Sequence, residues 1–121
     1  MRLTTVFLIL AAQCIVVPAL AQEGAVIAGT GATSCNQYLS DIGKTPAAER
    51  EYFAWAQGFL SGLLIRSPPG EHVDLKHRAL PYPDQMVFIR KFCEANLKDS
   101  FDASVLELYK TLRAHSSKDR T

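Results

Sequence analysis

The sequence predicts an all-α fold, a small four-helix bundle stapled by one disulfide. Apolar residues recur at i, i+3, i+4 and i+7 in four segments, which Gly, Pro or helix-capping residues separate. The alternation of apolar and polar residues that is typical of half-buried strands is absent. A secretion-type leader precedes two cysteines, Cys35 and Cys93, and an even cysteine count in an exported chain indicates a disulfide.

Residues 1–21 have the pattern of a cleavable signal peptide. Arg2 precedes a long uncharged apolar run, and Ala19 and Ala21 stand at positions −3 and −1 of a cut before Gln22. The run is shorter than the roughly 20 residues that a membrane-spanning helix needs. We therefore expect a periplasmic protein with no stable membrane insertion after cleavage.

Cleavage also settles which cysteines can pair. Cys14 lies inside the apolar run and follows Gln13, whereas a lipoprotein signal has a small residue directly before its cysteine. We therefore expect Cys14 to be removed with the signal peptide. Cys35 and Cys93 then allow a single pairing. The alternative is that both remain as buried free thiols.

The mature chain is expected to begin with a flexible leader over residues 22–33, which are rich in Gly and Ala. The first helix begins after Ser34, since Ser34 and Gln37 fit a capping box, and Gly43 is placed to end it. Its residues at i, i+3, i+4 and i+7 form one apolar face, made of Cys35, Tyr38, Leu39 and Ile42.

The second helix is expected to be the central one. Thr45 is placed as its N-cap and Pro46 as its first residue, and the pattern runs to about Arg66. Gly58 and Gly62 each cost about 1 kcal/mol of helix propensity, which predicts that another helix approaches closely there. The broad apolar stripe of this helix contains Tyr52, Trp55, Ala56, Phe59, Leu60 and Leu63.

A long irregular stretch over residues 67–82 separates the second helix from the third. The third helix begins near Pro81 and places Met86, Ile89, Cys93 and Leu97 on one face, so the disulfide would pin it to the first helix.

Asp99 or Ser100 is expected to cap the fourth helix. Its buried stripe contains Phe101, Val105, Leu108, Tyr109 and Leu112. The helical domain thus covers residues 34–113, and the polar residues 114–121 are expected to form a disordered tail.

The charge pattern argues against a nucleic-acid partner. The chain has 13 Lys and Arg and 12 Asp and Glu, and loss of Arg2 with the signal leaves 12 of each sign, with no basic stripe. In strong acid the carboxylates become neutral and the three histidines become charged, so the protein would carry about +15 charges and repel itself.

No motif indicates catalysis, a cofactor or a metal, so we expect no enzyme. Phosphate loops, nucleophile elbows and paired metal-ligating motifs are absent. His72 and His77 lie near two acidic residues but match no metal spacing, which favours solvated loop histidines, and His115 falls in the tail. Helix capping explains Asp99 and Asp102 better than an acid–base pair does.

Apolar surface is what remains for function. A helical domain this small does not hide every aromatic side chain, and an exposed patch would mark a client- or partner-binding site. The alternative is that these side chains all pack inside. The candidate binding residues are Tyr52, Trp55, Phe59, Leu60 and Leu63.

Several features over residues 34–113 resemble the HdeA/HdeB family of periplasmic acid-stress chaperones. They are the Ser34–Cys35 helix start, the small-residue central helix over 56–63, the helix that carries Cys93, and the start of the last helix over 99–105. The resemblance implies a folded homodimer near neutral pH, which opens in acid and holds denatured periplasmic proteins on apolar surface. It places Cys35 and Cys93 at the family's disulfide.

A second class of exported protein also fits the central helix. Small helical immunity proteins that neutralise a type VI secretion toxin are disulfide-bridged and have a Gly-punctuated central helix like this one. Such a protein needs a rigid surface that is shaped for one partner, whereas a holdase chaperone needs a fold that opens.

Overall fold

A computed structural model describes residues 26–121, so the predicted signal peptide lies outside the described residues. The described chain forms a 3-10 helix, η1, and four α-helices, and it contains no strand. None of the described helices is both long and apolar enough to span a membrane. The elements are η1 (Gly29–Ala32), α1 (Cys35–Lys44), α2 (Ala48–Ile65), α3 (Tyr82–Ala95) and α4 (Phe101–Lys118).

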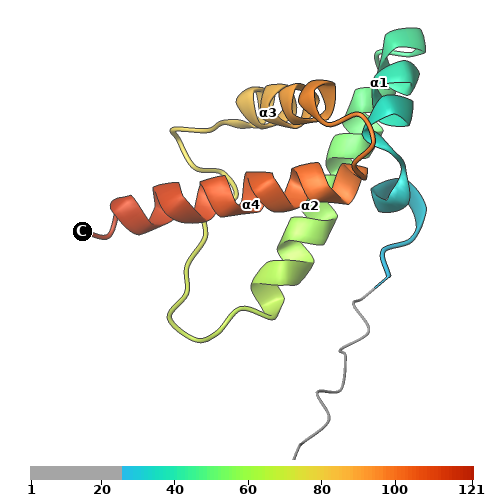
Figure 1. Cartoon of the computed structure of the whole chain (residues 1–121). Coiled ribbons are helices and arrows are strands. Elements are labelled where there is room, and N and C mark those ends of the chain that lie inside the picture. The colour runs from blue at the N-terminus through green and yellow to red at the C-terminus, as the bar shows by residue number, and fades with distance from the viewer. Residues whose placement is uncertain (1–25) are drawn as a thin grey trace, which may run out of the picture.

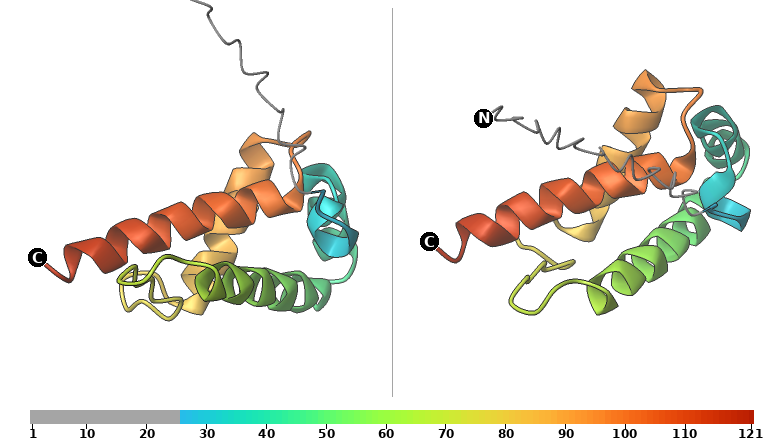
Figure 2. Two further views of the ribbon diagram at one scale, coloured as in Figure 1. Left: turned by 90° about the horizontal axis from the view of Figure 1, so that it is seen from below. Right: turned by 60° about the horizontal axis from the view of Figure 1, so that its bottom comes forward.

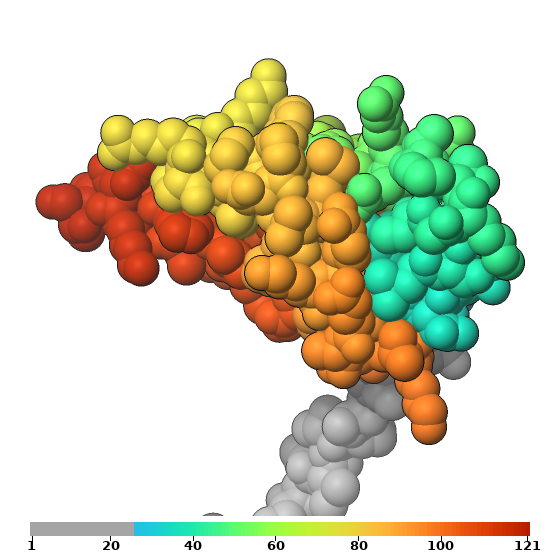
Figure 3. All heavy atoms as spheres, turned by 90° about the horizontal axis from the view of Figure 1, so that it is seen from above, coloured from blue at the N-terminus to red at the C-terminus, as the bar shows by residue number. Residues whose placement is uncertain are grey.

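The long helix α4 organises the arrangement (Figures 1 and 2). η1 and α1 lie at its N-terminal end, and the connection between α2 and α3 lies beside its C-terminal half. Figure 3 shows α3, in orange, seated between the α1–α2 end of the molecule and this connection. The all-α fold with four helices is therefore confirmed.

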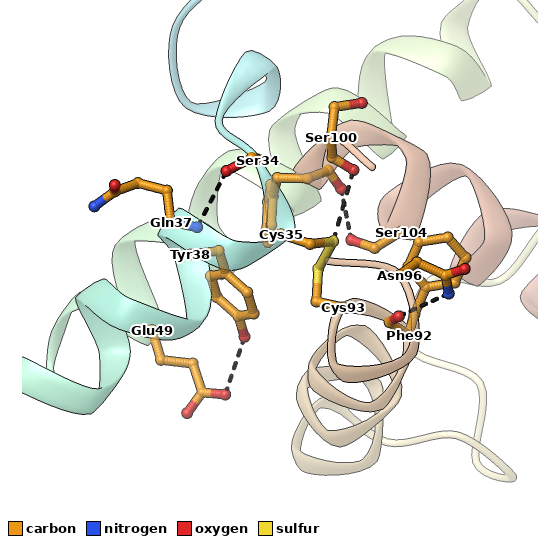
Figure 4. Close-up of a disulfide and its surroundings, with 11 residues drawn as sticks. Ser34, Cys35, Gln37, Tyr38, Glu49, Phe92, Cys93, Asn96, Ser100 and Ser104 are labelled. Carbon is orange, nitrogen blue, oxygen red and sulfur yellow. Dashed lines mark hydrogen bonds between the residues drawn. A yellow bond between two sulfur atoms is a disulfide. The ribbon is translucent and has the colours of Figure 1, made fainter. Parts of the chain in front are cut away.

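The predicted disulfide is also confirmed. Cys35 and Cys93 lie at bonding distance, with their sulfurs 2.07 Å apart and their Cα atoms 4.7 Å apart, and both are fully buried (Figure 4). The bridge joins the first turn of α1 to the last turn of α3. Because it spans 58 residues, it stabilises the fold by roughly 4 kcal/mol in the chain-entropy account.

The starts of α1 and α4 are joined by backbone hydrogen bonds beside the disulfide. The amide of Cys35 donates to the Asp99 carbonyl at 2.7 Å, and the amide of Phe101 donates to the Thr33 carbonyl at 2.7 Å. These bonds use donors that a helix N-terminus leaves without an intrahelical partner. Asp99 therefore contributes its carbonyl to this junction, and Ser100 is the N-cap residue of α4 without a side-chain cap.

Half of the predicted capping box at the start of α1 is present. The Ser34 hydroxyl accepts a hydrogen bond from the Gln37 amide at 3.1 Å. The Gln37 side chain does not reach back, because it donates to Asp41 at 2.6 Å instead.

The core joins all four helices, with Ile89 and Cys93 contributed by α3, and a cluster of aromatic rings lies where α1, α2 and α4 meet. Tyr38 and Phe101 are fully buried, and their ring centroids lie 5.0 Å apart. Tyr52 contacts both rings with centroid distances of 4.9 Å. Aromatic pairs in such tilted and edge-to-face geometries contribute beyond the area that they bury.

The leader departs from the flexible segment that the sequence predicts. Residues 29–32 form η1, and Gly31 is buried. A Cβ atom at Gly31 would lie 2.3 Å from the Trp55 ring, so glycine lets this segment cover the indole closely. Because the leader is rich in Gly and Ala, its sequence has no pattern that predicts this contact.

The predicted role of Gly58 and Gly62 is wrong. A Cβ atom at either position would meet nothing within 4 Å, so no helix of the described chain approaches this face closely. The close contact made by a glycine is instead the one between Gly31 and Trp55. Local pattern revealed the small residues on α2 but not which side of α2 faces solvent.

Three helix boundaries also differ from expectation. Gly43 lies inside α1, which ends at Lys44, and the residues after Thr45 form a tight turn before α2 begins at Ala48. At the other end of the chain, α4 continues to Lys118 through much of the expected tail, because the connection before α3 packs against it.

Candidate functional site

The predicted apolar binding residues belong to the core and its edge. Leu60 is fully buried. The others are half-buried and pack against the buried core, with Trp55 stacked on Phe59 at a centroid distance of 5.1 Å. In this structure they therefore form no exposed patch. The half-buried members are Tyr52, Trp55, Phe59 and Leu63.

One carboxylate oxygen joins three helices beside this core. Oε1 of Glu49, in the first turn of α2, accepts a hydrogen bond from the Tyr38 hydroxyl of α1 at 3.3 Å (Figure 4). The same oxygen accepts from Nε of Arg90 on α3 at 3.1 Å and from Nη2 at 2.8 Å. We call Tyr38, Glu49 and Arg90 the three-helix junction.

The surroundings keep the Tyr38 hydroxyl and the Arg90 guanidinium protonated in this junction. Burial raises the pKa of Tyr38, and the neighbouring Glu49 carboxylate raises it further, so the phenol stays a donor. The hydrogen bond to Glu49 likewise raises the pKa of Arg90. The charge-assisted bonds from Arg90 are the stronger contacts of the set.

A second carboxylate contact joins α1 to α2. The Tyr52 hydroxyl donates to Oδ2 of Asp41 at 2.7 Å. This bond and the one from Gln37 lower the pKa of Asp41, with the Tyr52 bond the larger cause. Tyr52 therefore belongs both to the aromatic core and to a contact that requires an ionised carboxylate.

The connection between α2 and α3, residues 66–81, follows the C-terminal half of α4, and we call it the strap. Glu71 forms an ion pair with Nε of Arg113 at 2.5 Å. The amide of Asp74 donates to the Ser116 hydroxyl at 2.9 Å. Further contacts join Ser67 to Tyr109 and Gly70 to Arg120. The strap also contributes Val73, which is buried, to the core.

A buried amide holds the other side of the strap. Gln85 of α3 is fully buried, and its Nε2 donates to the carbonyls of Leu75 and Leu80 at 2.8 and 2.9 Å. Its Oε1 accepts from Gln57 of α2 at 3.0 Å. Because each of these polar atoms has a partner, the network fixes the strap without an uncompensated buried group.

The two loop histidines have different environments. His72 is exposed, as the sequence predicts, but the prediction of a solvated His77 is wrong, because only 4% of this residue is exposed. Nε2 of His77 lies 3.0 Å from Oδ2 of Asp119, and Nδ1 accepts from the Ala79 amide at 3.1 Å. The His115 ring, on α4, lies 5.3 Å away between centroids.

These side chains do not form a metal centre. No group of three or more potential ligands within residues 26–121 is arranged to hold a metal ion. The geometry at His77 gives a reason. A histidine that binds a metal through Nε2 carries its proton on Nδ1, where the Ala79 amide already donates.

Two hollows lie on the surface beside these contacts. One, of about 480 Å³, opens between the end of α1 and the start of α2 and is lined by Asp41, Lys44 and Glu51. The other, of about 460 Å³, lies between the small-residue face of α2 and the strap. The second is lined by Gln57, Gly58, Ser61, Leu64, Asp74, Leu75, Lys76 and Tyr82.

Comparison of the chain with protein-family models, with curated proteins and with solved structures finds no match in any of the three.

Sequence reasoning missed the polar contacts of the fold. The sequence predicts no contact for Glu49, and its pattern places Tyr109 in the buried stripe of the last helix and Ser116 and Arg120 in the tail. The sequence does contain a signal for the residues that face the strap, because they recur at helical spacing and share one face. They are Tyr109, Arg113, Ser116 and Arg120. No local signal links Glu49 to Arg90, which lies 41 positions further along the chain.

Proposed function

We propose that this protein is a small periplasmic holdase chaperone, which acid opens so that its apolar residues bind denatured proteins. The observation that carries the proposal is the three-helix junction, where a single carboxylate ties α2 to both α1 and α3. The resemblance to the HdeA/HdeB family supports the same function.

Opposite charges hold this junction together. The attraction between Glu49 and Arg90 requires a charged carboxylate. The ion pair of Glu71 and Arg113, which fastens the strap to α4, has the same requirement. In acid the molecule becomes strongly cationic, and repulsion between its charges favours an expanded state.

The contact between Asp41 and Tyr52 also stabilises the fold less as pH falls. The folded-state pKa of Asp41 is lowered, so this group stabilises the fold above its ordinary carboxyl range. That stabilisation is lost as pH falls through the lowered value. This contact between α1 and α2 therefore weakens on acidification.

The covalent bridge decides which parts separate. Cys35 and Cys93 keep α1 and α3 together at every pH. The contacts of α2 with these two helices are not covalent, and beside aromatic packing they include hydrogen bonds to the carboxylates of Asp41 and Glu49. Release of α2 would uncover the half-buried Trp55 and Phe59 and the buried Leu60. These residues would then form the client-binding surface.

The test measures aggregation of a client protein that denatures at pH 2–3, with and without this protein, and repeats the assay at pH 7. We expect suppression in acid only. Phe59→Ser should weaken it, whereas Leu106→Ser, which changes an exposed apolar residue on α4, should not. Equal behaviour of the two variants would contradict the assignment to α2.

One observation favours a different function, a binding protein of the type VI immunity kind. The open face at Gly58 and Gly62 borders the groove beside the strap, and Ile65 at the end of the same helix is 84% exposed. Two helix glycines without an internal packing reason suit a surface that a partner approaches. Absence of suppression at both pH values would favour this function.

A further inference from the structure

We propose that His77 is a proton-sensitive latch, which fastens the strap to α4 when neutral and releases it when protonated in mild acid. This device goes beyond the proposed holdase function, because it concerns one segment and operates above the pH at which carboxylates protonate. Imidazole is the side chain that changes charge between pH 5 and 8.

The hydrogen bonds of His77 define the form that the closed strap holds. Nδ1 accepts from the Ala79 amide at 3.1 Å, so this nitrogen carries no proton in the closed state. The proton of the neutral ring is then on Nε2, which donates to Asp119 at 3.0 Å. A single tautomer satisfies both contacts.

Protonation disrupts this arrangement at one atom. A proton on Nδ1 points at the Ala79 amide proton, so one hydrogen bond is lost and two donors face each other. The same turn depends on His77 a second time, because the Leu80 amide donates to its carbonyl at 2.9 Å. The turn at residues 77–80 is therefore the part that opens first.

The surrounding charges do not compensate fully. On α4, Asp119 attracts a charged His77, but its side chain is 49% exposed, so solvent weakens the attraction. His115, also on α4, repels His77 when both rings are charged. On the strap, Asp74 is half-buried and Lys76 and Arg78 are exposed. On α3, the side chain that bonds to the strap at Leu75 and Leu80 is the neutral Gln85.

Opening of the latch has a defined consequence. The His77 ring is nearly fully buried, and a charged ring gains solvation when it leaves that position. The segment that moves with it includes Val73, Leu75 and Leu80, which cover the core. Mild acid would therefore uncover apolar surface beside α4 while the three-helix junction is still closed.

The test is amide hydrogen exchange of the oxidised protein at pH 7.5 and pH 5.0, with each rate divided by the intrinsic rate at that pH. We expect the protection of Ala79 and Leu80 to fall about five- to tenfold between the two conditions, as for loss of one hydrogen bond. Protection of Ile89 in the core of α3 should stay constant.

Two variants separate the latch from other causes. In His77→Asn the side-chain oxygen can still accept from the Ala79 amide but does not titrate, so protection should become independent of pH. The matched control His72→Asn, at an exposed position of the same strap, should keep the wild-type response.

Three outcomes would overturn the proposal. They are equal protection of Ala79 at both pH values in the wild type, an unchanged pH response in His77→Asn, and a parallel fall at Ile89, which would indicate global unfolding. The wild-type measurement is decisive even if the asparagine variant folds poorly. Because no client protein is involved, failure of the holdase assay leaves this test unaffected.

Discussion

Glu49 and Arg90 face each other across α2 and α3, and one carboxylate oxygen accepts two hydrogen bonds from the guanidinium, at 3.1 and 2.8 Å. The same oxygen also accepts from the hydroxyl of the buried Tyr38. This single atom therefore connects the start of α2 to both helices that the disulfide joins. Its position makes the packing of α2 dependent on charge.

Replacement of Glu49 should destabilise the protein at neutral pH. In Glu49→Leu, the Tyr38 hydroxyl and the Arg90 guanidinium both lose their acceptor, and we expect a loss of about 1–3 kcal/mol in the free energy of unfolding. Glu51→Leu is the matched control, because Glu51 lies in the same helical turn and is exposed. Urea unfolding at pH 7 measures both; equal effects would contradict the junction.

Removal of the Tyr52 hydroxyl should change how stability depends on pH. Its hydrogen bond is the main cause of the lowered pKa of Asp41, so in Tyr52→Phe that pKa should rise toward the ordinary carboxyl value. The variant should be less stable than the wild type at pH 7, and the difference should shrink as pH falls through the lowered pKa. Carboxyl NMR titration of Asp41 and urea unfolding at several pH values measure the two effects.

Loss of the disulfide should cost roughly 2–5 kcal/mol, the usual range for small disulfide-bonded domains. We expect Cys35→Ser combined with Cys93→Ser to lower the melting temperature strongly at pH 7. In the holdase assay the same variant should lose activity if grouping of α1 and α3 matters in the open state. A melting temperature equal to that of the wild type would show that the bridge does not stabilise the fold.

Glycine substitutions should have opposite effects at two places. Gly31→Ala places a methyl group 2.3 Å from the Trp55 ring, and overpacking of this kind costs about 1–3 kcal/mol. Gly62→Ala meets open space within a helix and should stabilise by about 1 kcal/mol. Thermal unfolding of the two variants compares them directly, and a stabilising Gly31→Ala would exclude the close contact with Trp55.

The Gly62→Ala variant also separates the two proposed functions. A methyl group on the open face of α2 should leave acid-induced holdase activity intact, since that face is not part of the core. It would weaken binding of a partner that seats closely on this face. Partner binding unaffected by Gly62→Ala would place the interaction elsewhere.

The sequence by itself determined the helices and the covalent bridge. Apolar periodicity is local, so it located all four helices, and the two cysteines that follow the predicted signal peptide left one pairing. The N-cap at Ser34 was also predictable, because the Ser34 hydroxyl and the Gln37 amide that donates to it are three residues apart. Such features depend on near neighbours along the chain.

Only the tertiary structure decided which polar groups meet. The contacts of Glu49 with Arg90, of Gln85 with Leu75 and of His77 with Asp119 join residues from separate elements. Their pairing depends on how the helices cross and how the strap returns along α4, which local periodicity does not encode. For the same reason the sequence placed Gly58 and Gly62 at a buried crossing, whereas the packing of α2 leaves them facing open space.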